Sequence, residues 1–272
     1  MFKQLKSEAI LSFKIRTRSP LFIASGNDTS LDPSATDDKY IEVFRNGTLE
    51  PYIPGTSLKG VFRSRAERIL KSGNIGSCDI IAGNECVYEK SVKLNHGKVL
   101  DGKTRYQRSC PVCRLFGSKV LRSRVTINDL YVIGDYKVGE RTCVGIDRIT
   151  GSAKKGALYN MQYIEKAEFQ GKMTLQNFEP YQIKLLLNLF IDMNEGFITL
   201  GGQTSKGFGQ VEAYDFSLQV RYYRLKENIT GYTKKEYYQS KTTDGFDKIY
   251  ELVKDININK VKRDGEIDEQ TI

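Results

Sequence analysis

Apolar and polar residues alternate with a period of two in several segments of the chain, which predicts β-strands. The clearest run covers Glu8–Thr17. Two more runs, Tyr40–Phe44 and Leu49–Ile53, flank an Asn-Gly pair, and such a pair between alternating runs is a strong hairpin signal. The remaining predicted strands are Val125–Ile133, Ala167–Leu175, Phe197–Leu200 and Phe208–Val220.

Two segments have helical periodicity instead. The residues after Gly55 place six apolar side chains on one helical face: Leu58, Val61, Phe62, Ala66, Ile69 and Leu70. Pro180–Met193 forms a second, more apolar helix. The order strand, helix, strand, strand, helix, strand within this series is the plan of the ferredoxin-like fold and of the RNA-recognition motif. We therefore expect an α+β protein.

Other segments lack a clear period. Residues 72–118 form a long insertion, and residues 134–163 are rich in Gly and Lys with little apolar pattern. The last fifty or so residues are rich in Tyr and then charged, with one predicted helix at Asp244–Lys254. These patterns predict one domain over residues 1–222, followed by a C-terminal extension at 223–272.

The composition favours a polyanionic partner. The chain of 272 residues has 42 Lys and Arg against 33 Asp and Glu, a net charge of +9. This balance is weak support for nucleic acid and says nothing about fold. No apolar run approaches the roughly 20 residues that span a bilayer, and the N-terminus lacks the apolar core of a signal peptide. We expect a cytoplasmic protein with no membrane partner, whose cysteines are ligands or plain thiols.

The segment Pro51–Arg65 combines features that bind phosphate. A proline turn and a glycine lead to two hydroxyl residues, Thr56 and Ser57, which are candidates for a helix N-cap. The helix then carries Lys59 and Arg63 four residues apart on one face. Backbone N–H groups, a helix N-terminus and cationic side chains would thus point at one spot.

Four of the five cysteines lie in the insertion. Cys78 and Cys86 have seven residues between them, and Cys110 and Cys113 form a Cys-Pro-Val-Cys motif. Four thiolates satisfy tetrahedral zinc, and a metal cross-link would explain how a segment with few apolar residues folds. His96, the only histidine, is an alternative to one thiolate. A redox role for the Cys-x-x-Cys motif is a further alternative, but no thioredoxin-like strand precedes it.

A glycine-rich stretch, Gly201–Gln210, precedes the last predicted strand. It lacks the Gly-Lys-Ser/Thr of a Walker loop and the helix that follows a dinucleotide fingerprint. Its glycines would let the backbone approach a ligand closely, and Lys206 adds charge. Taken alone, the stretch favours a plain hairpin turn.

Four aspartates share one polar loop before the predicted hairpin: Asp28, Asp32, Asp37 and Asp38. The loop is either a solvated turn or the source of a carboxylate that holds a divalent ion or assists attack on a phosphodiester. Because the chain has one histidine, a two-histidine ribonuclease mechanism is excluded.

These segments, in this order, resemble the RAMP superfamily of CRISPR-associated proteins, and most closely the backbone subunit of type III effector complexes. Tyr52–Gly60 resembles the family signature Ile-Pro-Gly-Ser-Ser-Leu-Lys-Gly, and Gly201–Gly209 resembles its closing glycine-rich loop. Ile146–Gly151 resembles the Asp-Arg-x-Thr segment that opens the thumb hairpin of the family. Cys110–Gly117 resembles the zinc-bearing variant of type III-D subunits and of fused single-chain effectors.

The resemblance, over roughly residues 8–220, implies an RNA-recognition-motif core with a zinc-bearing insertion at 72–118 and a thumb-like β-hairpin at 134–165. Copies of such a subunit stack into a filament on the guide RNA (crRNA), together with other CRISPR effector subunits. Each thumb interrupts the duplex of guide and complementary target RNA, and a loop aspartate cuts the target with Mg²⁺ or another divalent cation. By register this aspartate is Asp38, and a slip of one residue would make it Asp37. The implied RNA contacts are Thr56, Ser57, Lys59, Arg63, Arg148, Gly202, Ser205 and Lys206, and the implied zinc ligands are Cys78, Cys86, Cys110 and Cys113.

Three alternatives remain open. Some members of the family lack the aspartate and only bind RNA. The superfamily also contains an endonuclease that processes the guide precursor, but it usually carries a catalytic histidine near its N-terminus, whereas His96 lies in the insertion. An unrelated zinc-bearing RNA-modification factor would not explain the Pro-Gly signature.

Overall fold

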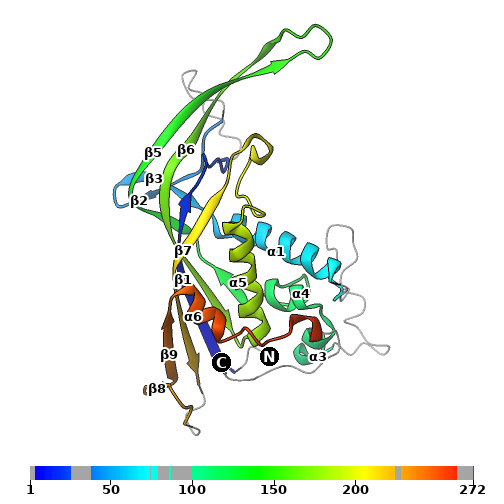
Figure 1. The fold of residues 1–272 in the computed structure, drawn as a ribbon, viewed down its shortest axis with the longest axis vertical. Coiled ribbons are helices and arrows are strands. Elements are labelled where there is room, and N and C mark those ends of the chain that lie inside the picture. Colours follow the sequence, from blue (N-terminus) through cyan, green and yellow to red (C-terminus); the bar gives the residue numbers. More distant parts are fainter. Residues whose placement is uncertain are drawn as a thin grey trace.

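The computed structural model describes residues 4–25, 38–73, 75–78, 86, 100–223, 228–261 and 272. In these residues a large antiparallel sheet forms one layer and the helices cover one of its faces (Figure 1). The prediction of an α+β protein is thus confirmed.

The strands are β1 (Ser7–Thr17), β2 (Glu42–Arg45), β3 (Thr48–Ile53), β4 (Val125–Ile127), β5 (Leu130–Ile146), β6 (Ala153–Gln176), β7 (Val211–Tyr222), β8 (Thr233–Lys234) and β9 (Gln239–Asp244). The helices are α1 (Gly55–Ser72), α3 (Gly102–Arg108), α4 (Pro111–Phe116), α5 (Pro180–Asn194) and α6 (Phe246–Glu251). Within the described residues the strand order is β2-β3-β5-β6-β1-β7-β9-β8, and β4 pairs with β6 beside this path.

The first strand lies at the centre of the sheet because one of its faces is buried and mostly apolar. Alternate residues of β1 (Ala9, Leu11, Phe13 and Ile15) are buried, and β1 pairs with β6 on one side and with β7 on the other. Phe190 of α5 contacts Phe13 with ring centroids 4.7 Å apart and Phe62 of α1 with centroids 5.1 Å apart. These edge-to-face contacts hold both long helices against the sheet.

A long hairpin of β5 and β6 projects from the sheet (Figure 1). The lower part of β6, from Glu168 to Gln176, pairs with β1, whereas the pairs from Cys143–Tyr159 to Ile146–Ala153 belong to the hairpin alone among the described residues. The residues that showed little apolar pattern therefore form extended strands. The absence of a pattern has a physical reason, since projecting strands have no core to bury a face against.

Several predicted elements need correction. No strand forms at Phe197–Leu200: the backbone N–H groups of Phe197 and Ile198 donate to the carbonyl of Asp192 at 2.8 and 3.3 Å, so the chain folds back on the end of α5. The strand predicted at Val125–Ile133 is divided into β4 and the start of β5. The predicted Asn-Gly hairpin turn between β2 and β3 is confirmed, since both turn residues have a positive φ.

The residues after 222 extend the sheet. β9 pairs with β7 over six residue pairs, from Ser217–Asp244 to Tyr222–Gln239, and β8 pairs with β9. The predicted C-terminal helix is present as the shorter α6. The division of the chain at residue 222 stays a prediction.

Candidate nucleic-acid interface and metal centre

The four cysteines of the insertion lie together. Their sulfur atoms are all within 4.8 Å of one another, and three of the four residues are buried. Cys78 follows α1, whereas Cys110 and Cys113 lie at the start of α4. The Sγ atom of Cys78 is 3.2 Å from that of Cys113 and 3.9 Å from that of Cys110. The backbone N–H of Cys110 donates to the sulfur of Cys86 at 3.2 Å.

This cluster fits a structural zinc ion. A Zn–S distance of about 2.3 Å places tetrahedral ligands about 3.8 Å apart, close to the spacing observed. Without a cation the four thiols compete for protons: the hydrogen bond with Cys110 raises the pKa of Cys113 far above that of a free thiol, whereas the bonds from Cys113 and Cys78 lower the pKa of Cys110. A divalent cation would resolve this competition by allowing all four thiolates to form. His96 lies outside the described residues, and Cys143 lies on β5.

A buried polar network attaches the cysteine segment to α5. Tyr106 of α3 has no exposed surface, and its hydroxyl donates to the carboxylate of Glu179. The side-chain amide of Gln182 donates to the same hydroxyl at 2.9 Å, and the hydroxyl of Tyr181 donates to the carbonyl of Pro111 at 3.2 Å. Burial is the largest cause that raises the pKa of Tyr106. The fold of the insertion thus rests on α5 as well as on the cysteines.

The start of α1 differs from the predicted phosphate site. The N-cap is Pro54, without a side-chain cap, so Thr56 and Ser57 lie inside the first turn and are not N-caps. The N–H of Gly55 donates at 2.8 Å to the carboxylate of Asp129. This carboxylate therefore occupies the position at the N-terminus of α1 where a phosphate was expected. The physical reason is that the turn between β4 and β5 reaches the helix end.

The two basic residues of α1 singled out by the sequence are both half-buried. Burial, and then the neighbouring charge of Arg63, lower the pKa of Lys59. The guanidinium of Arg63 has partners within the chain: Glu67, Gly117 and Cys113. Neither placement tests RNA binding, and for Lys59 such binding stays a prediction.

Two segments, residues 20–25 and 38–41, pair with each other and run beside β6; we call them the strap. Within the strap, the N–H of Ile41 donates to the carbonyl of Ile23 at 2.8 Å. Asp38 pairs with β6, because its N–H donates to Asn160 at 3.2 Å and its carbonyl accepts from Gln162 at 2.9 Å. Asp38 is therefore held at the base of the projecting hairpin. Asp28, Asp32 and Asp37 lie outside the described residues.

The glycine-rich loop, Gly201–Gln210, packs on the same strap. The N–H of Gly202 donates to the carbonyl of Phe22 at 2.7 Å, and that of Gly209 donates to Pro20 at 2.8 Å. Gly201 has φ +78°, and a Cβ there would lie 2.1 Å from the carbonyl oxygen of Phe22, so only glycine allows this approach. Ser205 and Lys206 are exposed in a short 3₁₀ turn. The strap thus holds both the glycine-rich loop and Asp38.

Three residues beside the strap were not predicted from the sequence: Arg141, Tyr163 and Phe208. The guanidinium of Arg141 on β5 lies 5.8 Å from the ring centroid of Tyr163 on β6 and 5.1 Å from that of Phe208. The two rings are in edge-to-face contact, with centroids 5.3 Å apart. Met161 is the cross-strand partner of Arg141 and also the bridge partner of Asp38. The only sign of this group in the sequence was that basic residues and tyrosines are interleaved along this stretch. Which of them face each other depends on the register of β5 and β6, and the sequence pattern does not give that register.

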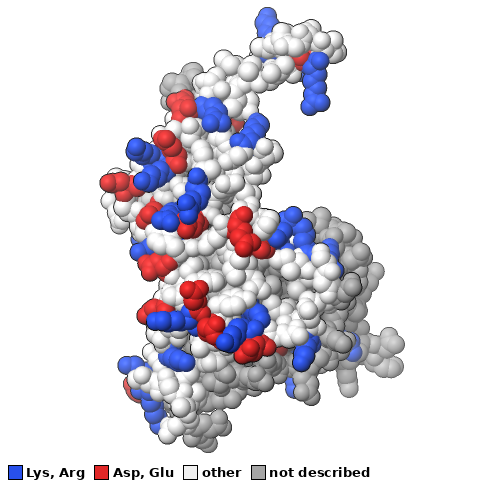
Figure 2. All heavy atoms as spheres, viewed as in Figure 1, with Lys and Arg blue, Asp and Glu red and all other residues white. Residues whose placement is uncertain are grey.

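Arg148 lies away from this group. The carboxylate of Asp147 accepts the N–H groups of Ile149 and Thr150 at 2.8 and 3.0 Å, which closes a tight turn between β5 and β6. The Asp-Arg-x-Thr segment therefore forms the tip of the hairpin and does not open it. Figure 2 shows Lys and Arg side chains projecting at this tip beside a small acidic area, and both signs of charge mixed over the body on this face.

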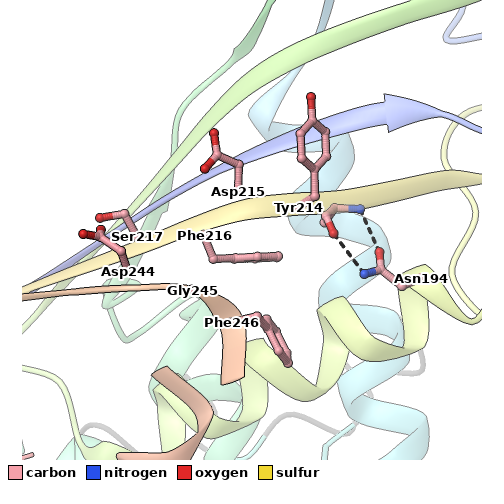
Figure 3. A pocket seen from close by; sticks show the side chains of 9 residues that line it. Asn194, Tyr214, Asp215, Phe216, Ser217, Asp244, Gly245 and Phe246 are labelled. Atoms are coloured by element: carbon pink, nitrogen blue, oxygen red, sulfur yellow. Dashed lines mark hydrogen bonds between the residues drawn. The ribbon is translucent and has the colours of Figure 1, made fainter. Parts of the chain in front are cut away.

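A cavity of about 430 Å³ lies at the edge of β7, where β9 ends, and none of the predicted site residues lines it. Two phenylalanines, Phe216 and Phe246, line it (Figure 3). At its rim the side-chain amide of Asn194 bonds to both backbone groups of Ala213, at 2.7 and 2.9 Å. Asn194 thus occupies the position of a neighbouring strand and covers the edge of β7.

A comparison with known protein families identifies the superfamily of the chain. The RAMP superfamily profile matches residues 14–212, which include the strap, the Pro-Gly signature, the cysteine cluster, the hairpin and the glycine-rich loop. No curated protein matches the chain. No helix in the described ranges has both the length and the apolar character needed to cross a membrane. With a match over most of its length, the chain belongs to the RAMP superfamily.

Proposed function

We propose that this protein is a crRNA-binding subunit of a type III CRISPR interference complex, that its copies form a filament on the guide with other effector subunits, and that it cleaves complementary target RNA at regular intervals. The observation that carries the proposal is the superfamily match over residues 14–212. The structure adds support, because the strap holds Asp38 and the glycine-rich loop together at the base of the hairpin.

An RNA-recognition-motif core is part of this proposal. The order β5-β6-β1-β7, with all neighbours antiparallel, and two long helices on one face agree with that plan. In this arrangement the β5–β6 hairpin would be the thumb.

The proposed RNA contacts act mainly on the phosphate backbone. They are Thr56, Ser57 and Lys59 from α1, Gly202, Ser205 and Lys206 from the glycine-rich loop, and Arg148 from the hairpin tip. Arg141 joins them because its exposed guanidinium lies between the hairpin and the glycine-rich loop. Contacts to phosphate hold RNA of any sequence, as a guide-binding subunit requires.

Asp38 is the proposed catalytic carboxylate, with Asp37 as the alternative. Asp38 is half-buried. The thiol of Cys143, then burial, and last the charge of Asp38 raise the pKa of Tyr159. One carboxylate together with substrate phosphate oxygens is a common binding mode for Mg²⁺. When bound, the cation would stabilise charge on the scissile phosphate. Asp38 would position it against the RNA.

Cleavage by an assembled complex tests the catalytic part. Labelled complementary RNA is incubated with wild type, Asp38→Ala and Asp37→Ala complexes, with magnesium or with chelator. Asp247→Ala, which removes an exposed carboxylate on α6, is the control. We expect regularly spaced, metal-dependent cuts that disappear in Asp38→Ala while guide and target binding are kept. Cuts that persist in both loop variants would remove these aspartates from the mechanism, and a wild type that binds without cutting would favour the binding-only alternative.

We propose zinc as a structural ion held by Cys78, Cys86, Cys110 and Cys113. Elemental analysis of freshly purified protein should find about one zinc per chain. Cys113→Ser should release the metal and lower solubility, whereas Cys143→Ser, on β5, should leave the zinc content unchanged. Protein without metal in the absence of any chelator would refute the zinc site.

The size of the bound RNA separates the remaining alternatives. A discrete, guide-sized RNA that purifies with the complex would support the backbone role. Cleavage of precursor RNA by the chain alone, without metal, would support the guide-processing endonuclease instead.

A further inference from the structure

The guanidinium of Arg63 points to the cysteine cluster. Its Nη2 atom donates to the Sγ atom of Cys113 at 3.6 Å, and its Nη1 atom donates to the carbonyl of Gly117 at 3.1 Å. Its Nε atom donates to Glu67, one turn further along α1, at 2.9 Å. All three nitrogen atoms thus have acceptors within the chain, although the sequence pattern predicts Arg63 as a phosphate contact next to Lys59.

Arg63 and Glu67, which lie one turn apart on α1, hold the two segments that carry the cysteines. Arg63 binds the segment with Cys113 and Gly117. The backbone carbonyl of Glu67 accepts from the hydroxyl of Ser77 at 3.0 Å, and Ser77 directly precedes Cys78. Segments that lie far apart in the chain are therefore fixed to one helical turn.

The charge of the proposed metal centre explains why a cation is needed there. Four thiolates around Zn²⁺ carry a net charge of about −2, and three of the four cysteines are buried. A buried negative charge is costly unless a donor or a cation compensates it. Groups that hydrogen-bond to metal ligands also fix their orientation and raise metal affinity.

We infer that Arg63 is a positioning residue of the cysteine centre, whose negative charge it offsets in part and which it attaches to α1, and that it does not contact RNA. The inference rests on the proposed zinc site. It separates two neighbouring basic residues by role, because Lys59 remains the phosphate contact one turn closer to the helix start.

Zinc release and RNA binding distinguish the two roles of Arg63. The variants are Arg63→Ala, Arg63→Lys and, as a matched control, Arg68→Ala, which removes an exposed arginine of the same helix. Zinc transfer to a chromogenic chelator is timed for each purified protein, and the thiolate charge-transfer band is recorded after replacement with Co²⁺. RNA affinity is measured over a range of salt concentrations.

Removing a residue that supports a metal ligand typically lowers metal affinity about 10–100-fold, so we expect Arg63→Ala to lose zinc faster than wild type by about that factor. Arg63→Lys keeps the charge but not the planar fork, so its release rate should lie between the two, with a shifted Co²⁺ band. Arg68→Ala should match wild type. The salt dependence of RNA binding should be unchanged in Arg63→Lys and Arg63→Ala.

Zinc release at the wild-type rate in both Arg63 variants would overturn the inference. So would a salt slope that is lower by about one unit in Arg63→Ala, because that is the loss expected for one phosphate contact. A wild-type protein that holds no zinc would refute the metal centre and this inference together, while the cleavage assay with Asp38 would still decide the proposed function.

Discussion

Gly55 allows α1 to start against the turn between β4 and β5. A Cβ atom at this position would lie 2.3 Å from the carbonyl oxygen of Ile127 and 3.0 Å from that of Asn128. Ordinary carbon–oxygen contacts begin at about 3.3 Å, so Gly55→Ala requires a shift of about 1 Å. The obstructing atoms belong to backbone that cannot rotate away. The shift would also lengthen the 2.8 Å hydrogen bond between the N–H of Gly55 and Asp129.

The expected magnitude follows from two opposing effects. Overpacking against rigid atoms costs about 1–3 kcal/mol, and weakening one hydrogen bond costs about 1 kcal/mol. Alanine gains up to about 1 kcal/mol over glycine in a helix, and less at its first position. We therefore expect Gly55→Ala to lower the free energy of unfolding by about 1–4 kcal/mol, which corresponds to a fall in Tm of roughly 2–10 °C for a chain of this length.

Gly60→Ala is the matched control, since it lies on the same helix and a Cβ there would meet no atom within 4 Å. It should raise the free energy of unfolding by about 0.5–1 kcal/mol. Urea denaturation followed by circular dichroism, with zinc present throughout, measures both variants. If Gly55→Ala is as stable as wild type, or is stabilised like Gly60→Ala, the close-approach argument is refuted.

Three further perturbations test other parts of the structure. Tyr106→Phe removes a hydroxyl that Glu179 and Gln182 share inside the protein, so the free energy of unfolding should fall by about 1–3 kcal/mol in denaturant titration; an unchanged midpoint would show that the network contributes no net stability. Asn194→Ala leaves the backbone of Ala213 without its two bonds, and we expect a loss of about 1–2 kcal/mol together with more aggregation by light scattering; a monodisperse variant of unchanged stability would contradict this. Removing zinc with a strong chelator should lower Tm, and metal should be released more readily as the pH falls because protons compete for the thiolates; metal retention independent of pH would argue against thiolate ligands.

The sequence predicted those elements whose pattern follows from burial. β1, α1 and α5 each bury a face or stripe, and their positions were predicted to within a few residues. Hydrophobic periodicity did not predict the strands of the β5–β6 hairpin, because its projecting part has no buried face. The cysteine cluster was predictable because its chemistry needs particular residue types.

What could not be predicted depends on contacts between distant parts of the chain. Asp129, which accepts the N–H of Gly55, lies 74 residues away from it. Arg63 and Cys113 are 50 residues apart. Periodicity along α1 showed that Arg63 does not lie on the apolar face that packs on the sheet. A face exposed to solvent and a face that meets an inserted segment both carry polar residues, so the contact of Arg63 with Cys113 could not be predicted. Local spacing therefore predicts which groups are available and leaves their partners open.

The β5–β6 hairpin has a consequence for the distribution of local stability. At its base, β6 is held by β5, by β1 and by the strap, so its amide hydrogens can exchange with solvent only when the sheet itself opens. From Tyr159 to Ala153 the ladder with β5 is the only pairing among the described residues, and Ile146, Ile149 and Leu158 are more than 60% exposed. A two-stranded ribbon without a packed face is marginally stable in water. Deuterium uptake in the free chain should therefore be rapid at the tip and should slow in steps along a single strand towards Asn160. Binding of an RNA or protein partner at the tip would extend the protected region outward along that strand.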